Sequence, residues 1–391
     1  MRSPTQRALS PADIQDILGS PVVDAAELSG GGFAAVWRAT LPDGRQVVVK
    51  VGPPPTARLL SYERGLLRRE AEYFRLVADR APVPSVLAAS DDWIVTTLLP
   101  GRPLTSADSP RARSQLGAVV ASVHRVTGPH FGYVSDPAVP PGPRSHPESA
   151  PAAPPRPRSH PEPAPTAPPR PRSHPESAPA APPRPRSHPE PAPTAPPRPR
   201  SHPESAPAAP PGPRSHRAPA SEAAGERACG PDWPTAFVAM VAALRADAAA
   251  WGVPLPPLDG VVERHASVLA EVTRPALLHF DLWDGNVLAG PSGELTGLVD
   301  GERYLYGDPL LDLVSPALFR RIEDTPGHPF LRGYGLTHFD RSARIRLALY
   351  RLHLYVLMLA EAPSRGIGRD RHDRVTRLLT DEIEHLGSFG Q

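Results

Sequence analysis

The chain has 391 residues, and more than half of its 57 prolines lie between Pro137 and Pro219. So much proline in one stretch excludes a uniformly globular chain and leaves roughly 300 residues for folded lobes. With 43 basic and 41 acidic residues, the formal charge is only +2. Charge therefore supplies no reason to expect nucleic acid or an anionic membrane as a partner.

Sequence features also bear on the compartment. The first residues after Met1 form no apolar segment, and the longest apolar stretch, residues 347–360, is interrupted by Arg351 and His353. It is too short to cross a bilayer. The single Cys229 cannot form an internal disulfide. We expect a protein without a membrane span in the reducing cytoplasm.

Near the start, Ser10 is placed to cap a short helix. Residues 27–51 then have the pattern of three antiparallel strands, with a glycine run, Gly30, Gly31 and Gly32, at the first hairpin. Glycines let backbone amides approach phosphate groups without an intervening side chain. A simple bulged hairpin is the alternative explanation of this run.

Lys50 ends the third of these strands and is the only lysine, since the other 42 of the 43 basic residues are arginines. An ammonium group is a compact point charge, unlike the planar guanidinium. Alternation along the strand places Val48 and Lys50 on one face and Val47 and Val49 on the other. We predict that Lys50 was retained for a phosphate-binding function.

A helix is predicted over residues 62–78, with Glu70 in its middle as the candidate partner of Lys50. A solvated glutamate paired with neighbouring arginines is the alternative. Two more strands, in residues 83–89 and 92–101, complete a five-stranded sheet with one helix. The segment from Leu98 to Gly101 would be a hinge.

The middle of the chain changes character. A helix is predicted over residues 111–126, with His124 packed in the core. From Pro143 a 14-residue unit repeats five times to Gly212 and begins a sixth copy. The unit has no aromatic residue and no aliphatic one larger than alanine, so it cannot build a core. We predict a disordered, polyproline-rich insert.

After the insert, one helix is predicted to begin at Asp232. Others are predicted over residues 258–272, 341–361 and 370–386. Between them lies the motif H-x-D-x-x-x-x-N, formed by His279, Asp281 and Asn286, and Asp300 follows it after a short strand. One carboxylate can accept the proton of an attacking hydroxyl, while the amide oxygen and the second carboxylate suit Mg²⁺ against ATP oxygens. Asp and Asn are also ordinary turn residues, which is the alternative.

Together these features resemble the aminoglycoside phosphotransferase family, small-molecule kinases with a protein-kinase-like fold. The resemblance implies an α+β bilobal fold with a small antiparallel-sheet N-lobe, a mostly helical C-lobe and the disordered insert. It divides the chain into a nucleotide-binding lobe (1–100), the start of the helical lobe (101–136), the insert (137–230) and the lobe with the catalytic loop (231–391).

The same resemblance implies the roles of individual residues. Asp281 would be the catalytic base. Asn286 and Asp300 would bind Mg²⁺. The nucleotide ATP would be held by these residues: Lys50, Glu70, Gly30, Gly31, Gly32, Thr97 and Leu98. Supporting roles would fall to His279, Glu302 and Asp312, the last by tying down the catalytic loop.

The motif from His279 to Asn286, with Phe131 to Tyr133 upstream, is also similar to fructosamine kinases, which read H-G-D-L-W-x-G-N. Only seven residues separate Asp300 from Asp308, too few for the activation segment of a protein kinase. We therefore expect a small hydroxyl-bearing acceptor. A fructosamine kinase-type repair enzyme is one alternative, and a nucleotide-binding pseudokinase whose proline-rich arm binds a partner is another.

Overall fold

The computed structural model describes residues 3–28, 32–134 and 229–389. The chain divides into two units, residues 1–139 with 217–391, and residues 140–216. The second unit, which contains the 14-residue repeats of the predicted insert, lies outside the described residues. None of the helices in the described ranges combines the length and apolarity needed to span a membrane.

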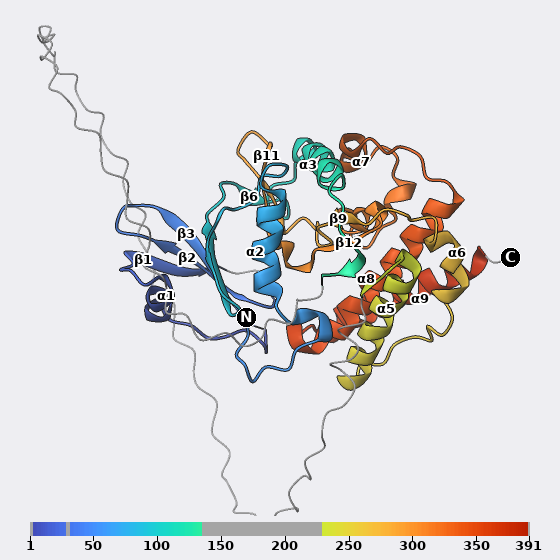
Figure 1. The fold of residues 1–391 in the computed structure, drawn as a ribbon, viewed down its shortest axis with the longest axis horizontal. Helices are drawn as coiled ribbons and strands as arrows, with labels where there is room; N and C mark the ends of the chain where they lie inside the picture. Colours follow the sequence, from blue (N-terminus) through green and yellow to red (C-terminus); the bar gives the residue numbers. More distant parts are fainter. Residues whose placement is uncertain (1–2, 29–31, 135–228, 390–391) are drawn as a thin grey trace, which may run out of the picture. The chain divides into compact units, whose positions relative to one another are not determined.

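The N-terminal lobe is built on a five-stranded antiparallel sheet in the order β1-β2-β3-β5-β4, with one helix on each face (Figure 1). Its elements are α1 (Pro11–Leu18), β1 (Asp24–Leu28), β2 (Ala35–Thr40), β3 (Gln46–Val51), the 3₁₀ turn η1 (Ser61–Glu63), α2 (Leu66–Val77), β4 (Val86–Ala89) and β5 (Trp93–Thr97). The five strands and the α+β class predicted from the sequence are confirmed.

The alternation predicted for β3 is also confirmed. Val47 and Val49 are buried in a cluster with Ile14 of α1, while Lys50 contacts Glu70 of α2 on the other face. Burying a valine side chain contributes about 1.5–3 kcal/mol, so this packing fixes the register of β3 and the direction of Lys50. Ser10 caps α1 as predicted, accepting from the Asp13 N–H.

Helix α2 begins later than predicted. The sequence pattern indicated a helix from residue 62, but Gly65 has a left-handed backbone (φ 69°) and separates η1 from α2. Only glycine adopts this conformation without strain. The interruption places Tyr62 and Glu63 outside α2, where both reach side chains of the C-terminal lobe.

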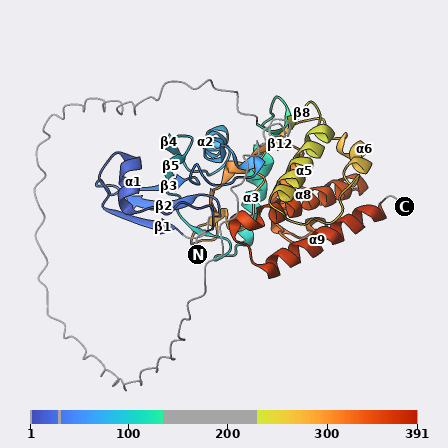
Figure 2. The ribbon, with the colours of Figure 1, turned by 90° about the horizontal axis from the view of Figure 1, so that it is seen from below.

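The C-terminal lobe is mostly helical, as predicted, and it also contains two small sheets. Its helices are α3 (Pro110–Val123), α5 (Trp233–Ala250), α6 (Ala266–Leu269), α7 (Pro329–Tyr334), α8 (Arg341–Arg365) and α9 (Arg369–Ser388). Its strands are β6 (Arg102–Pro103), β7 (Phe131–Tyr133), β8 (Cys229–Gly230), β9 (Ala276–Leu278), β10 (Val287–Ala289), β11 (Leu295–Leu298) and β12 (Leu305–Gly307). Short 3₁₀ turns are η2 (Glu263–His265), η3 (Gly301–Arg303), η4 (Pro309–Leu313) and η5 (Ile322–Asp324). Figure 2 shows α5, α8 and α9 side by side.

Two expectations need correction here. The helix predicted over residues 258–272 is wrong for most of its length, because Gly260 is left-handed (φ 67°) and only a 3₁₀ turn and α6 form. The predicted insert included Cys229 and Gly230, but these residues form β8 and pair with β7.

Candidate active site

Lys50 lies between two carboxylates from different parts of the chain. Its Nζ is 2.5 Å from Glu70 Oε1 of α2, and it also contacts Asp300 Oδ1, which follows β11. Only 9% of Lys50 is exposed and Glu70 is fully buried. The alternative of a solvated glutamate is therefore wrong for Glu70.

Lys50 on one side and the carboxylates of Asp300 and Glu70 on the other shift one another's pKa values towards the charged forms. Burial alone would lower the pKa of Lys50, but the carboxylates of Asp300 and Glu70 outweigh it and raise that pKa. Burial likewise works against the ionised Asp300, yet Lys50 holds the pKa of this carboxyl below its usual value. Burial raises the pKa of Glu70 to about 7, with Lys50 opposing. Lys50 thus stays cationic, as a phosphate-binding group must.

The loop between β9 and β10 is shaped by Asp312 of η4. Its two carboxylate oxygens accept the N–H groups of His279 (2.9 Å) and Phe280 (2.6 Å), and Oδ2 lies 3.0 Å from His124 Nε2. Phe280 has φ 67°, a left-handed backbone that is uncommon for a bulky residue. Such a conformation persists only where its surroundings hold it, and here Asp312 does so.

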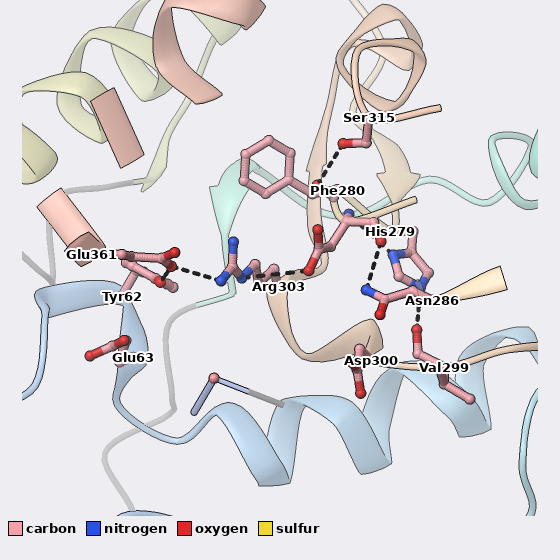
Figure 3. A network of polar contacts seen from close by, with 12 residues as sticks. Tyr62, Glu63, His279, Phe280, Asn286, Val299, Asp300, Arg303, Ser315 and Glu361 are labelled. Carbon is pink, nitrogen blue, oxygen red and sulfur yellow. Dashed lines mark hydrogen bonds and ion pairs between the residues drawn. The ribbon is translucent and has the colours of Figure 1, made fainter. Parts of the chain in front are cut away.

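His279 orients the next part of the loop. Its Nδ1 accepts the Asp281 N–H at 3.2 Å, so its Nε2 carries the proton and donates to the Val299 carbonyl at 3.1 Å (Figure 3). Burial lowers the pKa of His279, which keeps the ring neutral. His279 therefore links the catalytic loop to the residue before Asp300.

A hydrogen bond within the loop joins Asn286 to Asp281. The Asn286 Nδ2 group donates to the Asp281 carbonyl at 2.9 Å, so the amide oxygen points away from this bond (Figure 3). Burial raises the pKa of the Asp281 carboxyl, and Arg303 and His279 only partly offset the effect. A raised pKa makes a carboxylate a better proton acceptor.

Arg303 is a site residue that sequence reasoning missed. Its Nη2 donates to Glu361 Oε1 of α8 at 2.7 Å, and its Nε lies 4.0 Å from Asp281 Oδ2 (Figure 3). Tyr62 contacts the same Glu361 oxygen and lies under the guanidinium, 5.5 Å from Arg303 Cζ. The only signal for Arg303 in the sequence was its position three residues after Asp300.

Some of these residues line a cavity of about 810 Å³, while Lys50, Glu70, His279 and Asp312 lie outside its lining. The predicted residues that line it are Gly32, Asp281, Asn286, Asp300 and Glu302. The rest of its wall comes mainly from α8, α9 and residues 315–319.

The remaining residues predicted to bind the nucleotide are Gly30, Gly31, Thr97 and Leu98. Gly30 and Gly31 lie outside the described residues. Thr97 and Leu98 lie at the end of β5, away from the lining of the cavity. Trp283 lines the cavity, whereas Tyr304 and Tyr306 are buried in the core.

A comparison with protein-family models identifies the family of the chain. The model of the phosphotransferase enzyme family matches residues 24–186 and 214–346. The chain belongs to this family. This confirms the resemblance drawn from the sequence, and the protein is a small-molecule phosphotransferase.

Solved structures of similar fold include members of two enzyme groups. A candidate fructosamine-3-kinase from Thermobifida fusca is 19% identical, with 95% of this chain and 98% of that one covered and a TM-score of 0.52. Another from Haemophilus somnus is 13% identical, with 94% and 95% covered and a TM-score of 0.56. A thermostable mutant of the aminoglycoside phosphotransferase APH(4)-Ia, with AMP-PNP and hygromycin B bound, is 14% identical, with 95% and 96% covered and a TM-score of 0.53. No curated protein sequence matches the chain.

The buried His353 leads us to expect that the folded protein loses stability in acid. His353 of α8 packs between the rings of Phe237 and Phe280 at centroid distances of 5.6 and 5.3 Å, and neither ring nitrogen has a hydrogen-bond partner. Burial lowers the pKa of His353 to about 3 from an ordinary 6.5. Between these values the unfolded chain binds a proton that the folded chain does not. The contribution of the neutral His353 ring to the free energy of unfolding is therefore fully present above pH 6.5. It is lost progressively as the pH falls towards 3.

We expect His353→Leu to weaken the pH dependence of unfolding. The difference in unfolding free energy between pH 7.5 and pH 5 should shrink by about 2 kcal/mol, measured by urea denaturation. Any packing cost of the substitution is the same at both pH values and cancels. Equal pH dependence in both proteins would mean that His353 is protonated without penalty.

Proposed function

We propose that the protein transfers the γ-phosphate of ATP to a hydroxyl group of a small molecule. The observation that supports this best is the convergence of Asp281, Asn286 and Asp300 on one cavity, with Lys50 held against Asp300. A base, two oxygen ligands and a phosphate-binding cation are the parts that phosphoryl transfer needs. A cavity of about 810 Å³ also suits a small acceptor.

In this proposal Lys50 binds the α- and β-phosphates while Glu70 holds its ammonium group in place. Lys50 now contacts both Glu70 and Asp300, so the ammonium group already lies beside the cavity. The phosphates would take over the contact that Asp300 makes. The glycine run and the backbone groups near Thr97 and Leu98, which would face the adenine, would complete the proposed nucleotide site.

The donor set fits Mg²⁺. The Asn286 amide oxygen and the second oxygen of Asp300 are hard ligands on the cavity wall, and no described group of three or more His, Cys, Asp or Glu side chains forms a separate metal cage. Mg²⁺ commonly binds through one or two protein oxygens and shares substrate phosphates. When bound, it would neutralise charge on those phosphates.

Asp281 would accept the proton of the acceptor hydroxyl. Burial raises the pKa of its carboxyl, and the Arg303 guanidinium lies near it, with Nε 4.0 Å from Asp281 Oδ2. Glu302, which lines the cavity and is nearly buried, would add negative charge near the metal. Because ATP is the proposed donor, we place the activity in the cytoplasm.

The test is phosphoryl transfer itself. The full chain is incubated with [γ-³²P]ATP, Mg²⁺ and a library of hydroxylated compounds that includes aminoglycosides, macrolides, fructosamines and amino alcohols. We expect a labelled product from one compound class. ATP binding without any labelled product would instead favour the pseudokinase alternative, and a product only from fructosamines would favour the repair enzyme.

We predict that Lys50→Arg is not conservative. The planar guanidinium is bulkier than the ammonium group and cannot occupy the same point between Glu70 and Asp300. We expect the KM for ATP to rise and kcat to fall, together lowering kcat/KM at least about tenfold. The matched control is Arg45→Lys, the reverse exchange at a side chain that is 69% exposed. Unchanged constants in Lys50→Arg would show that the single lysine has no role in phosphate binding.

A further inference from the structure

The catalytic loop is anchored at its start by Asp312, but Asp281 and Asn286 lie further along it. Asp312 accepts the N–H groups of His279 and Phe280, and the loop then continues to β10. In this later part the Asn286 side chain donates to the Asp281 carbonyl at 2.9 Å. A bond inside a loop fixes the shape of the loop, whereas a bond to another element also fixes its place.

Arg113 of α3 provides such a bond to the middle of the loop. Its Nη1 donates to Asp284 Oδ1 at 2.6 Å, and its Nη2 donates to Asp284 Oδ2 at 2.7 Å. Two parallel bonds from one guanidinium fix the plane of a carboxylate as well as its position. Asp284 lies three residues after Asp281 and two before Asn286. The pair therefore holds the loop between the two side chains that the proposed chemistry uses.

The surroundings of this ion pair favour an ordered contact. The Arg113 side chain is 16% exposed and that of Asp284 is 35% exposed, so water reaches the pair only in part. Fully exposed pairs often contribute little, but a bidentate arginine–carboxylate pair is the geometry in which the contact matters. The Nε of Arg113 also donates to the exposed Asp108 at 3.0 Å. Asp108 thus restrains the guanidinium from the side of α3.

Helix α3 is itself firmly held. It lies beside α7 (Figure 1), so close that a Cβ atom at Gly117 would be 2.1 Å from the Phe330 carbonyl oxygen. At its C-terminal end His124 contacts Asp312, the carboxylate that anchors the start of the loop. Arg113 and His124 are eleven residues apart, which is roughly 16 Å along a helix. One helix therefore reaches the catalytic loop at two separate points.

The same helix holds the hairpin of β10 and β11, which connects the loop to Asp300. The Ser109 hydroxyl donates to the Gly293 carbonyl at 2.5 Å, and the Gln115 side chain accepts the Leu295 N–H at 2.8 Å. Both bonds join the first half of α3 to the turn of the hairpin or the strand after it. Helix α3 thus supports each of the segments that carry the proposed base and the proposed metal ligands.

From these contacts we infer that Arg113 is a positioning residue of the phosphotransferase site. By holding Asp284 against α3, it keeps Asp281 and Asn286 in the arrangement that transfer requires. Arg113 does not line the cavity, so it acts through Asp284 and the loop. The inference rests on the proposed phosphotransferase function and adds to it a residue outside the cavity on which the rate depends.

Substitution of Arg113 separates rate from nucleotide binding. Arg113→Met removes both bonds to Asp284 and keeps a long side chain. We expect kcat with the best acceptor to fall at least about tenfold, since a misplacement of about 1 Å can cost about a hundredfold in rate. The KM for ATP should stay within about twofold, because the proposed phosphate contact comes from Lys50 on the other lobe. Arg113→Lys, which keeps the charge without the fork, should lie between the two.

Hydrogen exchange measures the position of the loop without any turnover. In Arg113→Met, the amides of residues 279–288 should exchange at least about fivefold faster, while the thermal midpoint moves by only a few degrees. Asp284→Asn should reproduce both the faster exchange and the lower kcat. The double variant should be no worse than either single one, because all three lack the same contact.

Two controls separate this contact from the loss of an arginine as such. Asp108→Asn removes the exposed partner of Arg113 and leaves the bonds to Asp284 in place. Arg245→Met breaks a surface pair of 2.6 Å with Asp259, and neither of these residues lines the cavity. Both variants should keep kcat and loop exchange within about twofold of the original.

The outcomes distinguish the inference from the function on which it rests. If the original protein labels an acceptor, unchanged loop exchange in Arg113→Met overturns the inference while the phosphotransferase function stands. Faster exchange with an unchanged kcat overturns it as well, since the position of the loop would then not limit transfer. If the original protein labels no compound, the phosphotransferase function is overturned, and the inference with it.

Discussion

Replacing Asp281 by asparagine should lower kcat at least about a hundredfold and leave the affinity for ATP nearly unchanged. The amide has the shape of the carboxylate but cannot accept the proton of the acceptor hydroxyl. It also loses the charge that faces Arg303 at 4.0 Å. Nucleotide binding is affected little, because the proposed phosphate contacts come from Lys50 on the other lobe.

The measurement is steady-state transfer to the best acceptor, with ATP affinity determined by calorimetry. Asp324→Asn is the control, since this exposed aspartate pairs with Arg344 and neither residue lines the cavity. It should behave as the original protein. Near-normal turnover in Asp281→Asn would remove Asp281 from the proposed chemistry.

Replacing Asp312 by alanine should destabilise the protein by about 3–5 kcal/mol. The carboxylate is 1% exposed and accepts from two backbone N–H groups, with His124 as a third partner. Its removal leaves these buried groups unpaired and releases the left-handed Phe280. We therefore expect kcat to fall as well, even in the fraction that stays folded.

Urea denaturation measures the loss of stability. Asp340→Ala is a matched control, because Asp340 also accepts a backbone N–H, that of Ala343 at 2.7 Å, but does so as an exposed cap of α8. Its loss should cost only about 1 kcal/mol. A cost for Asp312→Ala no larger than this would show that the loop is held by other contacts.

Local patterns in the sequence predicted the parts of the site that depend on one element each. Strand alternation set the direction of Lys50, and helical spacing put Glu70 within its reach. The loop motif set the order of Asp281 and Asn286. The catalytic roles of these residues stay predictions, although the structure brings the side chains together.

Contacts between distant segments could not be predicted in this way. Arg303 reaches Glu361, and Arg113 of α3 holds Asp284 of the catalytic loop with two bonds of 2.6 and 2.7 Å. Such pairs join residues far apart in the chain, for which periodicity carries no information. The helix prediction over residues 258–272 was wrong for a similar reason. Val261 and Val262 are buried although they lie in irregular turns, so a pattern of apolar residues does not by itself distinguish such turns from a helix.

The pairing of β7 with β8 has a consequence for the history of the sequence. Phe131 pairs with Gly230 and Gly132 with Cys229, so the chain departs from the lobe and rejoins it at neighbouring positions of one ladder. Replication slippage that adds or deletes a 14-residue unit therefore leaves both strands and their partner β12 in register. Where such a connection is flexible, each doubling of its length costs only about 0.6 kcal/mol of closure entropy. We therefore expect a change in copy number at this junction to leave the register of β7, β8 and β12 unchanged.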